Sequence, residues 1–279
     1  MMKKLFIILV IIAVSTYCYL SYQAWVSNDY FKVIFFDVGQ GDSSLIITPT
    51  GKTILTDGGP DNKVLRELGK ELPFWVRHLD AVVLTHAHDD HLLGLIEVCR
   101  RYQIKQILYN NLDFNTPALT ALTNTLRAEK IKLTVVYPGM VFNFGDNCQL
   151  QILAASKEQG IDENDYSIVS SFNCLNRKVL FTGDAGLKIE ESLLNKKIDL
   201  KADILKISHH GSKTANSINF LQAVNPKLAL ISLGLNNKYK HPDSNIIERL
   251  KKIAVDIYRT DLSGSLVILA NNKEISIMH

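Results

Sequence analysis

The sequence predicts an α+β fold in which two β-sheets pack together and helices cover their outer faces. Short apolar runs bounded by turn residues alternate with helical patterns, but without the regular strand–helix repetition of a Rossmann fold. No repeat of fixed period, low-complexity tract or long linker divides the 279 residues. Because 47% of the residues are hydrophobic, we expect one large domain with a packed core.

The N-terminal segment, residues 1–28, is predicted to be a signal or membrane anchor preceding a hydrolase domain at 29–279. Lys3 and Lys4 precede the run LFIILVIIAV, and the apolar stretch approaches the length that crosses a bilayer. We favour an uncleaved anchor over a removed signal peptide because good cleavage sites are scarce. With the two lysines on the cytoplasmic side, the domain is expected to be extracytoplasmic, anchored to the membrane or secreted.

Strands and helices follow in a mixed order. Strands are predicted within residues 32–43, 44–59, 79–85, 104–111, 131–139, 148–155, 166–174, 178–184, 202–210 and 227–234. Helices are predicted at 62–72, from about 92 to 102, and at 116–130, 185–196, 217–224 and 243–253, with Thr116 and Pro117 as a cap and first-turn pair. The first half places hairpin-like strands before its helices, and the second half loosely repeats that character.

Charge and cysteine content narrow the chemistry. The chain has 31 basic and 28 acidic residues, so its total charge is not that of a general polyanion binder. Its four cysteines include no CxxC pair, which excludes a cysteine-based metal site. We expect Cys99, Cys148 and Cys174 to be buried thiols.

The motif LTHAHDDHLLG, residues 84–94, places three histidines and two aspartates in six residues directly after the apolar run AVVL. Imidazoles and carboxylates that converge at the end of a strand are typical of a first-row metal site, zinc above all. His86 and His88 can face one point of an extended loop, whereas Asp90 and His91 can face a second, so the spacing indicates two metals. The alternative is a solvated charged loop that starts a helix, with Asp89 or Asp90 as its cap.

Other candidate ligands lie in later motifs. His209 and His210 stand in ISHHGS and His241 in KYKHPDS, while Asp184 ends an apolar strand in VLFTGDAG. Asp184 alone is typical of a helix N-cap, but beside a histidine cluster we interpret it as a ligand that bridges two cations.

Together, THAHDDH, TGD and a downstream histidine resemble the metallo-beta-lactamase superfamily of binuclear hydrolases. The stretches FFDVGQGDSSLI, ILTDGG, ADILKISHHGSKT and LISLGLNNKYKHP resemble the hydrolase domain of ComEC-type DNA-uptake proteins, over residues 32–269. The resemblance implies an αββα sandwich of two mixed β-sheets flanked by helices, with the metal site at one edge between the sheets.

The resemblance also implies roles for individual residues. His86 and His88 would bind the first metal, Asp90 and His91 the second, and Asp184 would bridge them. His241 falls where the last metal histidine of the superfamily is expected. One residue of the pair His209 and His210 would bind metal while the other contacts substrate or moves a proton, and we rank His209 slightly ahead as the ligand. Asp90, His209 and His210 are the residues expected to act in catalysis.

One departure from the superfamily affects the first metal, because no histidine occurs from Leu92 to Gly183. The ComEC-like pattern implies that Asn164 or Asp165, near Ser167, faces the metal instead. An oxygen donor in place of nitrogen favours harder ions, so the expected cofactor is two divalent metal ions, zinc or manganese.

Residues around the motifs are candidates for substrate contact or ligand support. Asp37, Gln40, Asp42 and Asp57 resemble the family's loops bordering the site, although turn formation around the glycines explains them as well. Basic and aromatic residues flank ISHHGSKT and NNKYKHP and would hold phosphate oxygens: Lys206, Lys213, Lys238, Tyr239 and Lys240.

The favoured function is hydrolysis of a phosphodiester by metal-activated water, as in a nuclease acting on extracytoplasmic DNA. A second hypothesis is an exported hydrolase of a small ester, such as a phosphorylcholine-type headgroup or a lactone. A third, of another class, is a non-catalytic metal-binding partner of a DNA-uptake channel. The expected partners are therefore DNA or another phosphodiester, the membrane through the N-terminal segment, and a separate channel.

Overall fold

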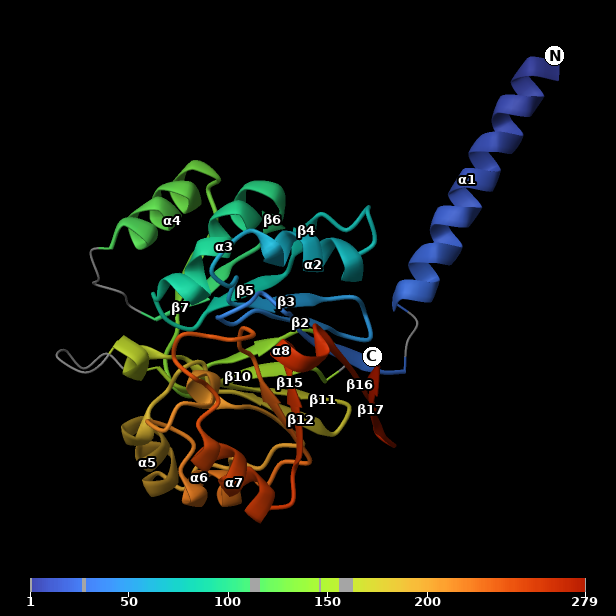
Figure 1. Cartoon of the computed structure of the whole chain (residues 1–279). Helices are drawn as coiled ribbons and strands as arrows, with labels where there is room; N and C mark the ends of the chain where they lie inside the picture. Colours follow the sequence, from blue (N-terminus) through green and yellow to red (C-terminus); the bar gives the residue numbers. More distant parts are fainter. Residues whose placement is uncertain (1, 27–28, 111–115, 146, 156–162, 279) are drawn as a thin grey trace.

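The computed structural model describes the chain except residues 1, 27–28, 111–115, 146, 156–162 and 279. Helix α1 (Met2–Val26) projects from the remainder of the chain (Figure 1). Its stretch from Lys3 to Tyr22 has a mean hydropathy of 2.2 and is long and apolar enough to cross a membrane. None of that stretch is buried against the domain. The predicted boundary at residue 28 lies outside the described residues.

The first sheet has eight strands in the order β17-β16-β1-β2-β3-β5-β7-β8. Their bounds are β1 Phe31–Phe35, β2 Ser44–Ile47, β3 Thr53–Thr56, β5 Ala81–Leu84, β7 Ile107–Tyr109, β8 Leu133–Val135, β16 Leu266–Ala270 and β17 Ile275–Met278. Pairing is antiparallel from β17 through β3 and parallel from β3 through β8.

The second sheet has seven strands in the order β15-β14-β13-β12-β11-β10-β9. Their bounds are β9 Val141–Asn143, β10 Gln149–Ala154, β11 Val169–Cys174, β12 Arg177–Phe181, β13 Ile204–Lys206, β14 Leu228–Ile231 and β15 Asp256–Arg259. Pairing is antiparallel from β9 through β12 and parallel from β12 through β15. Both sheets therefore combine an antiparallel part with a parallel part. This shared pairing pattern explains the loose similarity between the two halves of the sequence.

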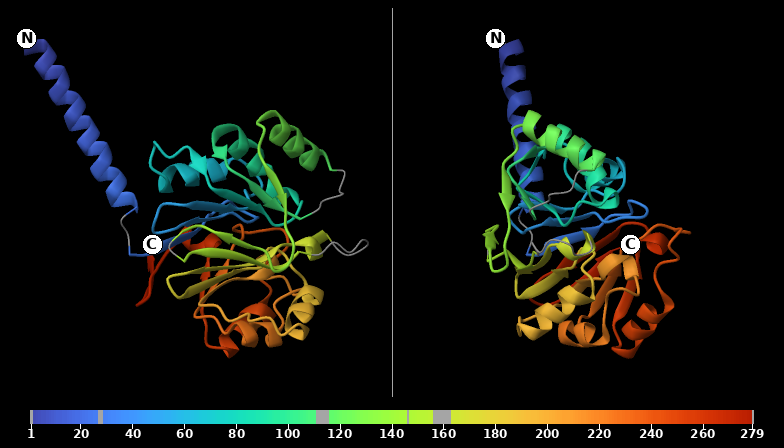
Figure 2. Two further views of the ribbon diagram at one scale, coloured as in Figure 1. Left: turned by 180° about the vertical axis from the view of Figure 1, so that it is seen from behind. Right: turned by 90° about the vertical axis from the view of Figure 1, so that its left-hand side faces the viewer.

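Helices cover the outer faces of both sheets, as the successive layers in Figure 2 show. Over the first sheet lie α2 Lys63–Glu71, α3 Asp89–Arg101 and α4 Pro117–Ala128, and over the second lie α5 Leu187–Asn195, α6 Ile218–Val224 and α7 Ser244–Lys252. Shorter elements are β4 His78–Leu79 paired with β6 Gln103–Ile104, α8 Thr260–Ser263, and the 3-10 turns η1 Glu163–Tyr166 and η2 Ser208–Gly211. The predicted α+β architecture of two mixed sheets between helices is confirmed.

Three apolar clusters follow from this layering, one between the sheets and one under each set of helices. Between the sheets, Phe31 meets Phe172 edge-on at 5.5 Å and Phe35 stacks on Phe181 at 6.0 Å. These aromatic pairs join the two sheets, because each pair takes one ring from each.

The cysteine prediction is partly wrong. Cys148 and Cys174 form a disulfide beside the β10–β11 hairpin, whereas Cys99 is a buried free thiol. Their spacing of 26 residues carries no signal by itself, and it is the antiparallel pairing of β10 with β11 that brings them together.

Helix ends follow the predicted local chemistry at α4, where the Thr116 side chain accepts a hydrogen bond from the Leu119 amide and Pro117 opens the helix. Helix α3 begins at Asp89 rather than near Leu92, so Asp90 and His91 belong to its first turn. Helix α3 packs closely against the segment around Gly58, and the contact is made at Gly94. A Cβ atom there would lie 1.9 Å from the Gly58 carbonyl oxygen.

Candidate metal centre

Parallel strands from both sheets end at one edge of the sandwich, and the polar motifs follow those strand ends. The segment with His86 and His88 follows β5, Asp184 follows β12, and the turn with His209 and His210 follows β13. This is where open α/β sheets place ligand sites, because the loops at the carboxyl ends of the strands converge there.

Four imidazole nitrogens surround one carboxylate oxygen, Oδ2 of Asp184. The distances to this atom from the Nε2 atoms are 3.4 Å for His91, 3.5 Å for His210, 3.9 Å for His86 and 4.0 Å for His209. Two ligands of a tetrahedral zinc ion, each about 2.0 to 2.1 Å from the metal, are ~3.3 Å apart. The cluster therefore has nearly the spacing of a coordination shell.

His91 is oriented by a carboxylate behind it. Its Nδ1 lies 2.8 Å from Oδ2 of Asp57, which leaves Nε2 directed toward Asp184. Asp57 is itself held by Thr85, whose backbone amide and hydroxyl donate to the two carboxylate oxygens at 2.8 and 2.7 Å. Such a carboxylate–histidine pair is a usual support for a metal ligand.

His86 and His210 are oriented in the same way. Nδ1 of His86 lies 3.0 Å from the Thr85 hydroxyl and 3.4 Å from that of Ser167, and Nδ1 of His210 lies 2.8 Å from the Ser232 carbonyl oxygen. In each ring, the nitrogen farther from the backbone is the one that faces Asp184, although Nε2 of His86 also lies 3.1 Å from Nδ1 of His88.

The backbone is unusual at two points of this edge. His209 and His210 have φ of 50° and 52°, a left-handed conformation that non-glycine residues seldom adopt consecutively. Gly41 lets the DVGQGD loop reach α3, since a Cβ atom there would lie 2.3 Å from the Asp90 carbonyl oxygen. The Asp42 amide donates to that same oxygen, which places the Asp42 side chain inside the site.

Burial and charge shift the titration of these groups. Burial disfavours charge on His91 and His210, but the Asp184 carboxylate, with Asp57 beside His91 and Asp42 beside His210, raises the pKa of both rings well above the usual value. The same contacts hold the pKa of Asp184 well below its usual value despite burial. Burial and the neighbouring His91 lower the pKa of His86, so this ring is a neutral donor.

The donor set fits divalent cations. Among the described residues, four groups of three side chains have ligand atoms within 4.8 Å of one another: His86, His91 and Asp184; Asp90, His91 and His210; Asp42, Asp184 and His210; and Asp42, Asp57 and His91. The Nε2 atoms of His91 and His210 and Oδ1 of Asp184 are buried without a hydrogen-bond partner in the described chain. Buried donors of this kind, aimed at a common point, are typical of a metal site.

The remaining predicted ligands lie farther out. His88 is one-third exposed, with Nδ1 3.1 Å from Nε2 of His86 and Nε2 2.8 Å from Glu163. His241 is half-buried, and its ring centroid is 6.0 Å from that of His209. Asp90 is partly exposed, 3.4 Å from Nε2 of His210, and this contact lowers its pKa to about 2 against the opposing effect of burial.

Lys206 corrects one prediction, because it is not a rim lysine. It is buried, forms an ion pair with Asp42, donates to the Gly183 carbonyl oxygen at 2.9 Å and lies 3.6 Å from Oδ1 of Asp184. Burial opposes its charge, but the two carboxylates raise its pKa. Its position in the strand motif DILK explains this, because the parallel strand β13 runs between β12 and β14.

Other candidates border the site. The Asp37 carboxylate accepts from the Gly39 amide and so holds a local turn. The Gln40 side-chain oxygen accepts from the Gly234 amide and so joins the DVGQGD loop to the segment after β14, while Asp42 and Asp57 face the cluster. Lys213 and Lys240 are exposed, and Asn164 and Asp165 lie in η1. Glu163 was missed by the sequence reasoning, because nothing in ENDYSIV links it to His88.

A profile of the metallo-beta-lactamase superfamily matches residues 36–234, and the chain belongs to this superfamily, whose members are mostly metal-dependent hydrolases. Its curated relatives include the ComE operon protein 3 of Bacillus subtilis, 28% identical over 259 residues that cover 87% of this chain and 33% of that protein. Competence protein ComA of Neisseria gonorrhoeae is 31% identical over 236 residues, covering 84% and 31%. The ComEC-type resemblance is confirmed, and the chain spans about a third of the length of these relatives.

Solved structures agree on the fold. YhfI of Bacillus subtilis, a metallo-beta-lactamase fold protein, superimposes with a TM-score of 0.60 at 14% identity, covering 86% of this chain and all of that chain. CmlA of Streptomyces venezuelae, a diiron β-hydroxylase, superimposes with a TM-score of 0.58 at 16% identity, covering 86% and 54%. At these identities the likeness shows the αββα fold alone.

Proposed function

We propose that this protein is a binuclear metal-dependent phosphodiesterase that cleaves extracytoplasmic DNA. The observation that carries the proposal is the convergence of four imidazoles on Oδ2 of Asp184 in a chain related to competence proteins. His86, His88 and Asp184 would hold one cation, and Asp90, His91, His210 and Asp184 the other. Two divalent cations bound there, zinc or manganese, would activate a water molecule near neutral pH and neutralise charge on the phosphodiester.

Within the pair His209 and His210, we propose the reverse of the ranking suggested by sequence. His210 is buried, its Nδ1 faces a carbonyl oxygen, and its Nε2 belongs to two of the groups able to hold a cation. His209 is one-quarter exposed, and burial lowers its pKa, which favours the neutral ring. Its Nδ1 lies 3.3 Å from the Thr214 hydroxyl, an exposed partner that leaves the ring at the solvent edge of the cluster. His210 is thus the ligand, and His209 is placed to exchange a proton with the leaving group.

The exposed rim supports a phosphate-bearing substrate. Tyr239 is exposed and stacks on His241 with ring centroids 5.8 Å apart, and Nζ of Lys238 lies 5.0 Å from the Tyr239 centroid. An aromatic ring beside lysines can stack a base and hold the phosphate backbone, the combination used for single-stranded nucleic acid. Lys240, next to Tyr239 in the chain, and Lys213, which follows the HHGS motif, are exposed and add positive charge.

The location outside the cytoplasm is supported by α1 and by the disulfide. Lys3 and Lys4 precede the apolar span, which orients it with the domain outside the membrane. The disulfide of Cys148 with Cys174 is typical of an oxidising compartment. The relatedness to competence proteins, of which this chain spans about a third, supports association with a DNA-uptake channel as a further part of this proposal.

The test is cleavage of single- and double-stranded DNA by the full chain in detergent, with zinc or manganese. We expect metal-dependent cleavage that weakens steeply with salt and is absent from the double variant His88→Ala with Asp184→Ala. The matched control Asp199→Ala removes an exposed carboxylate that pairs with Lys178, and it should cleave normally.

The other hypotheses predict different results in the same assay. Intact DNA together with rapid, salt-insensitive hydrolysis of a phosphorylcholine ester or a lactone would identify a small-ester hydrolase. Bound metal without hydrolysis of any of these substrates would identify a binding module.

A further inference from the structure

We propose that the loop at residues 72–77, which carries Phe74 and Trp75, inserts into the headgroup interface of the membrane that holds α1. The domain would then rest on the bilayer at a second point and turn its metal site away from the lipid. This inference rests on the proposed anchoring by α1.

The loop exposes apolar surface that the domain does not use. Phe74 is 74% exposed, the highest value among the large apolar side chains in the described chain, α1 included, and Trp75 is 39% exposed. Their rings form an edge-to-face pair with centroids 4.9 Å apart. Two adjacent exposed aromatic rings on a loop mark a contact surface.

The chemistry of the loop suits a bilayer interface. Residues 72–79 read LPFWVRHL, with no carboxylate, and Arg77 and His78 are exposed just after the aromatic pair. Lys52 and Lys70 are exposed as well, each in an ion pair, with Asp80 and Glu67 respectively. Tryptophan at the headgroup level with basic residues beside it is the usual composition of segments that lie in a membrane interface.

Contacts place the loop close to the end of α1. Trp25, in the last turn of α1, packs over the turn between β2 and β3, where a Cβ atom at Gly51 would lie 2.8 Å from Cζ3 of its ring. Thr53, two residues further along, contacts the strand that the loop enters: its hydroxyl donates to the His78 carbonyl oxygen and its carbonyl oxygen accepts from the Asp80 amide. In Figure 1 the connection between α2 and β4 lies on the side from which α1 leaves the domain.

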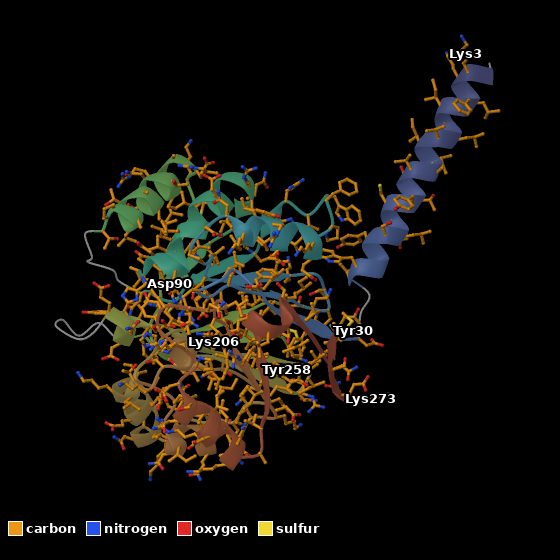
Figure 3. The ribbon with its side chains drawn as sticks, in the orientation of Figure 1. Lys3, Tyr30, Asp90, Lys206, Tyr258 and Lys273 are labelled. Atoms are coloured by element: carbon orange, nitrogen blue, oxygen red, sulfur yellow. A yellow bond between two sulfur atoms is a disulfide. The ribbon has the colours of Figure 1, made fainter. Side chains whose placement is uncertain are left out.

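The metal centre lies at the other end of the same strands. In β2, Ile47 pairs with Lys32 at the start of β1, whereas Ser44 pairs with Phe35, beside the loop that leads to Asp42. Figure 3 shows Asp90 toward the side of the domain away from Tyr30 and Lys273, with Lys206 between them. A domain seated on the loop at 72–77 therefore presents the metal site to the aqueous phase, where a long polymer can reach it.

The two tryptophans of the chain, Trp25 and Trp75, make the test direct. The variant Trp25→Phe leaves Trp75 as the reporter in the full chain, reconstituted into phosphatidylcholine–phosphatidylglycerol vesicles with lipids brominated near the headgroup. We expect these lipids to quench Trp75 emission about twofold or more, and aqueous iodide to quench it weakly.

The matched control moves the reporter to the rim of the metal site in the variant Trp25→Phe, Trp75→Phe, Tyr239→Trp. Tyr239 is exposed at that rim, so this tryptophan should be quenched by iodide and not by the brominated lipids. If Trp25→Phe weakens packing of α1, comparison of the wild type with Trp75→Phe isolates the Trp75 signal by difference.

Vesicle flotation separates the two possible failures. A chain that floats with the vesicles while Trp75 is quenched by iodide and not by lipid overturns this inference and leaves the anchor intact. A chain that does not float overturns the proposed anchoring, and the interfacial loop with it.

Discussion

His91 and His88 come from the same six-residue motif, yet the fold supports them differently. His91 is fully buried, with Asp57 behind it at 2.8 Å and Asp184 in front of it at 3.4 Å. His88 is one-third exposed, and its outer nitrogen contacts Glu163, a partly exposed residue of a short turn. The difference shows that buried protein contacts position the His91 side of the centre without a bound cation. At the rim, His88 is positioned by an exposed contact for which water can compete.

The same contrast separates the two histidines of ISHHGS. His210 faces the interior between Ser232 and Asp184, and His209, one residue earlier, faces the solvent edge. Two consecutive left-handed residues produce this division, since the backbone turns between the rings. A ligand benefits from rigid support, whereas a residue that exchanges protons needs access to the substrate.

The largest effect on hydrolysis is expected at Asp184, which the imidazoles of both the buried side and the rim face. Asp184→Asn removes the charge that four imidazoles share, and hydrolysis should fall by about a thousandfold or more, as expected when several kcal/mol of charge stabilisation is lost. Metal content measured by mass spectrometry should fall with it. Full activity with both cations retained would place the bridging role elsewhere.

The buried side should also depend on Lys206. Lys206→Met removes the buried ammonium that pairs with Asp42 and lies near Asp184, and breaking such an ion pair costs about 3 to 5 kcal/mol. We expect this loss in urea unfolding of the metal-free protein and a smaller loss with cations added. Lys227→Met, at an exposed pair with Asp203, is the matched control and should cost under about 1 kcal/mol. Equal losses for both variants would argue against a special role for the buried amine.

Support behind a ligand can be tested at Asp57. Asp57→Asn keeps the shape but removes the carboxylate that orients His91, and metal affinity should fall by about 10- to 100-fold, the usual effect of losing such a partner. Competition with a chromogenic chelator gives the affinity. Unchanged affinity would mean that His91 needs no support from this carboxylate.

The pH dependence of metal uptake follows from the raised pKa of His91 and His210. In the metal-free protein these rings hold protons near neutral pH, and a cation must displace them, so affinity should rise with pH. The expected slope is about tenfold per pH unit for each proton released. Calorimetry in two buffers of different ionisation enthalpy counts the protons, and uptake without release would contradict the paired arrangement.

The smallest effect is expected at the rim. Glu163→Gln removes the charge beside His88, but both groups are partly exposed, so activity should change by no more than a few-fold. Steady-state rates for this variant and for Asp57→Asn compare the two sides directly. A loss of activity in Glu163→Gln as large as that in Asp57→Asn would show that the contact at the rim matters as much as the buried one.

Several predictions depended only on neighbouring residues, and these agree with the structure. The Thr116 and Pro117 helix start is an example, because a cap is made within one turn. The order of strands and helices and the two-sheet architecture followed from apolar periodicity and from the motifs. The disulfide, the buried position of Lys206 and the Glu163 contact could not be predicted, because each joins segments that only strand pairing or sheet packing brings together.

The sequence by itself determined the class of this protein, since THAHDDH, TGD and a downstream histidine resemble the metallo-beta-lactamase superfamily, and ISHHGS resembles its ComEC-type members. Local order along the chain is enough to place donors at strand ends. Only the tertiary structure decided which donors meet at Asp184, which of His209 and His210 turns inward, and which end of the sandwich adjoins α1. Those outcomes depend on distances between strands of the two sheets. Such distances are set by tertiary packing and not by neighbouring residues in the sequence.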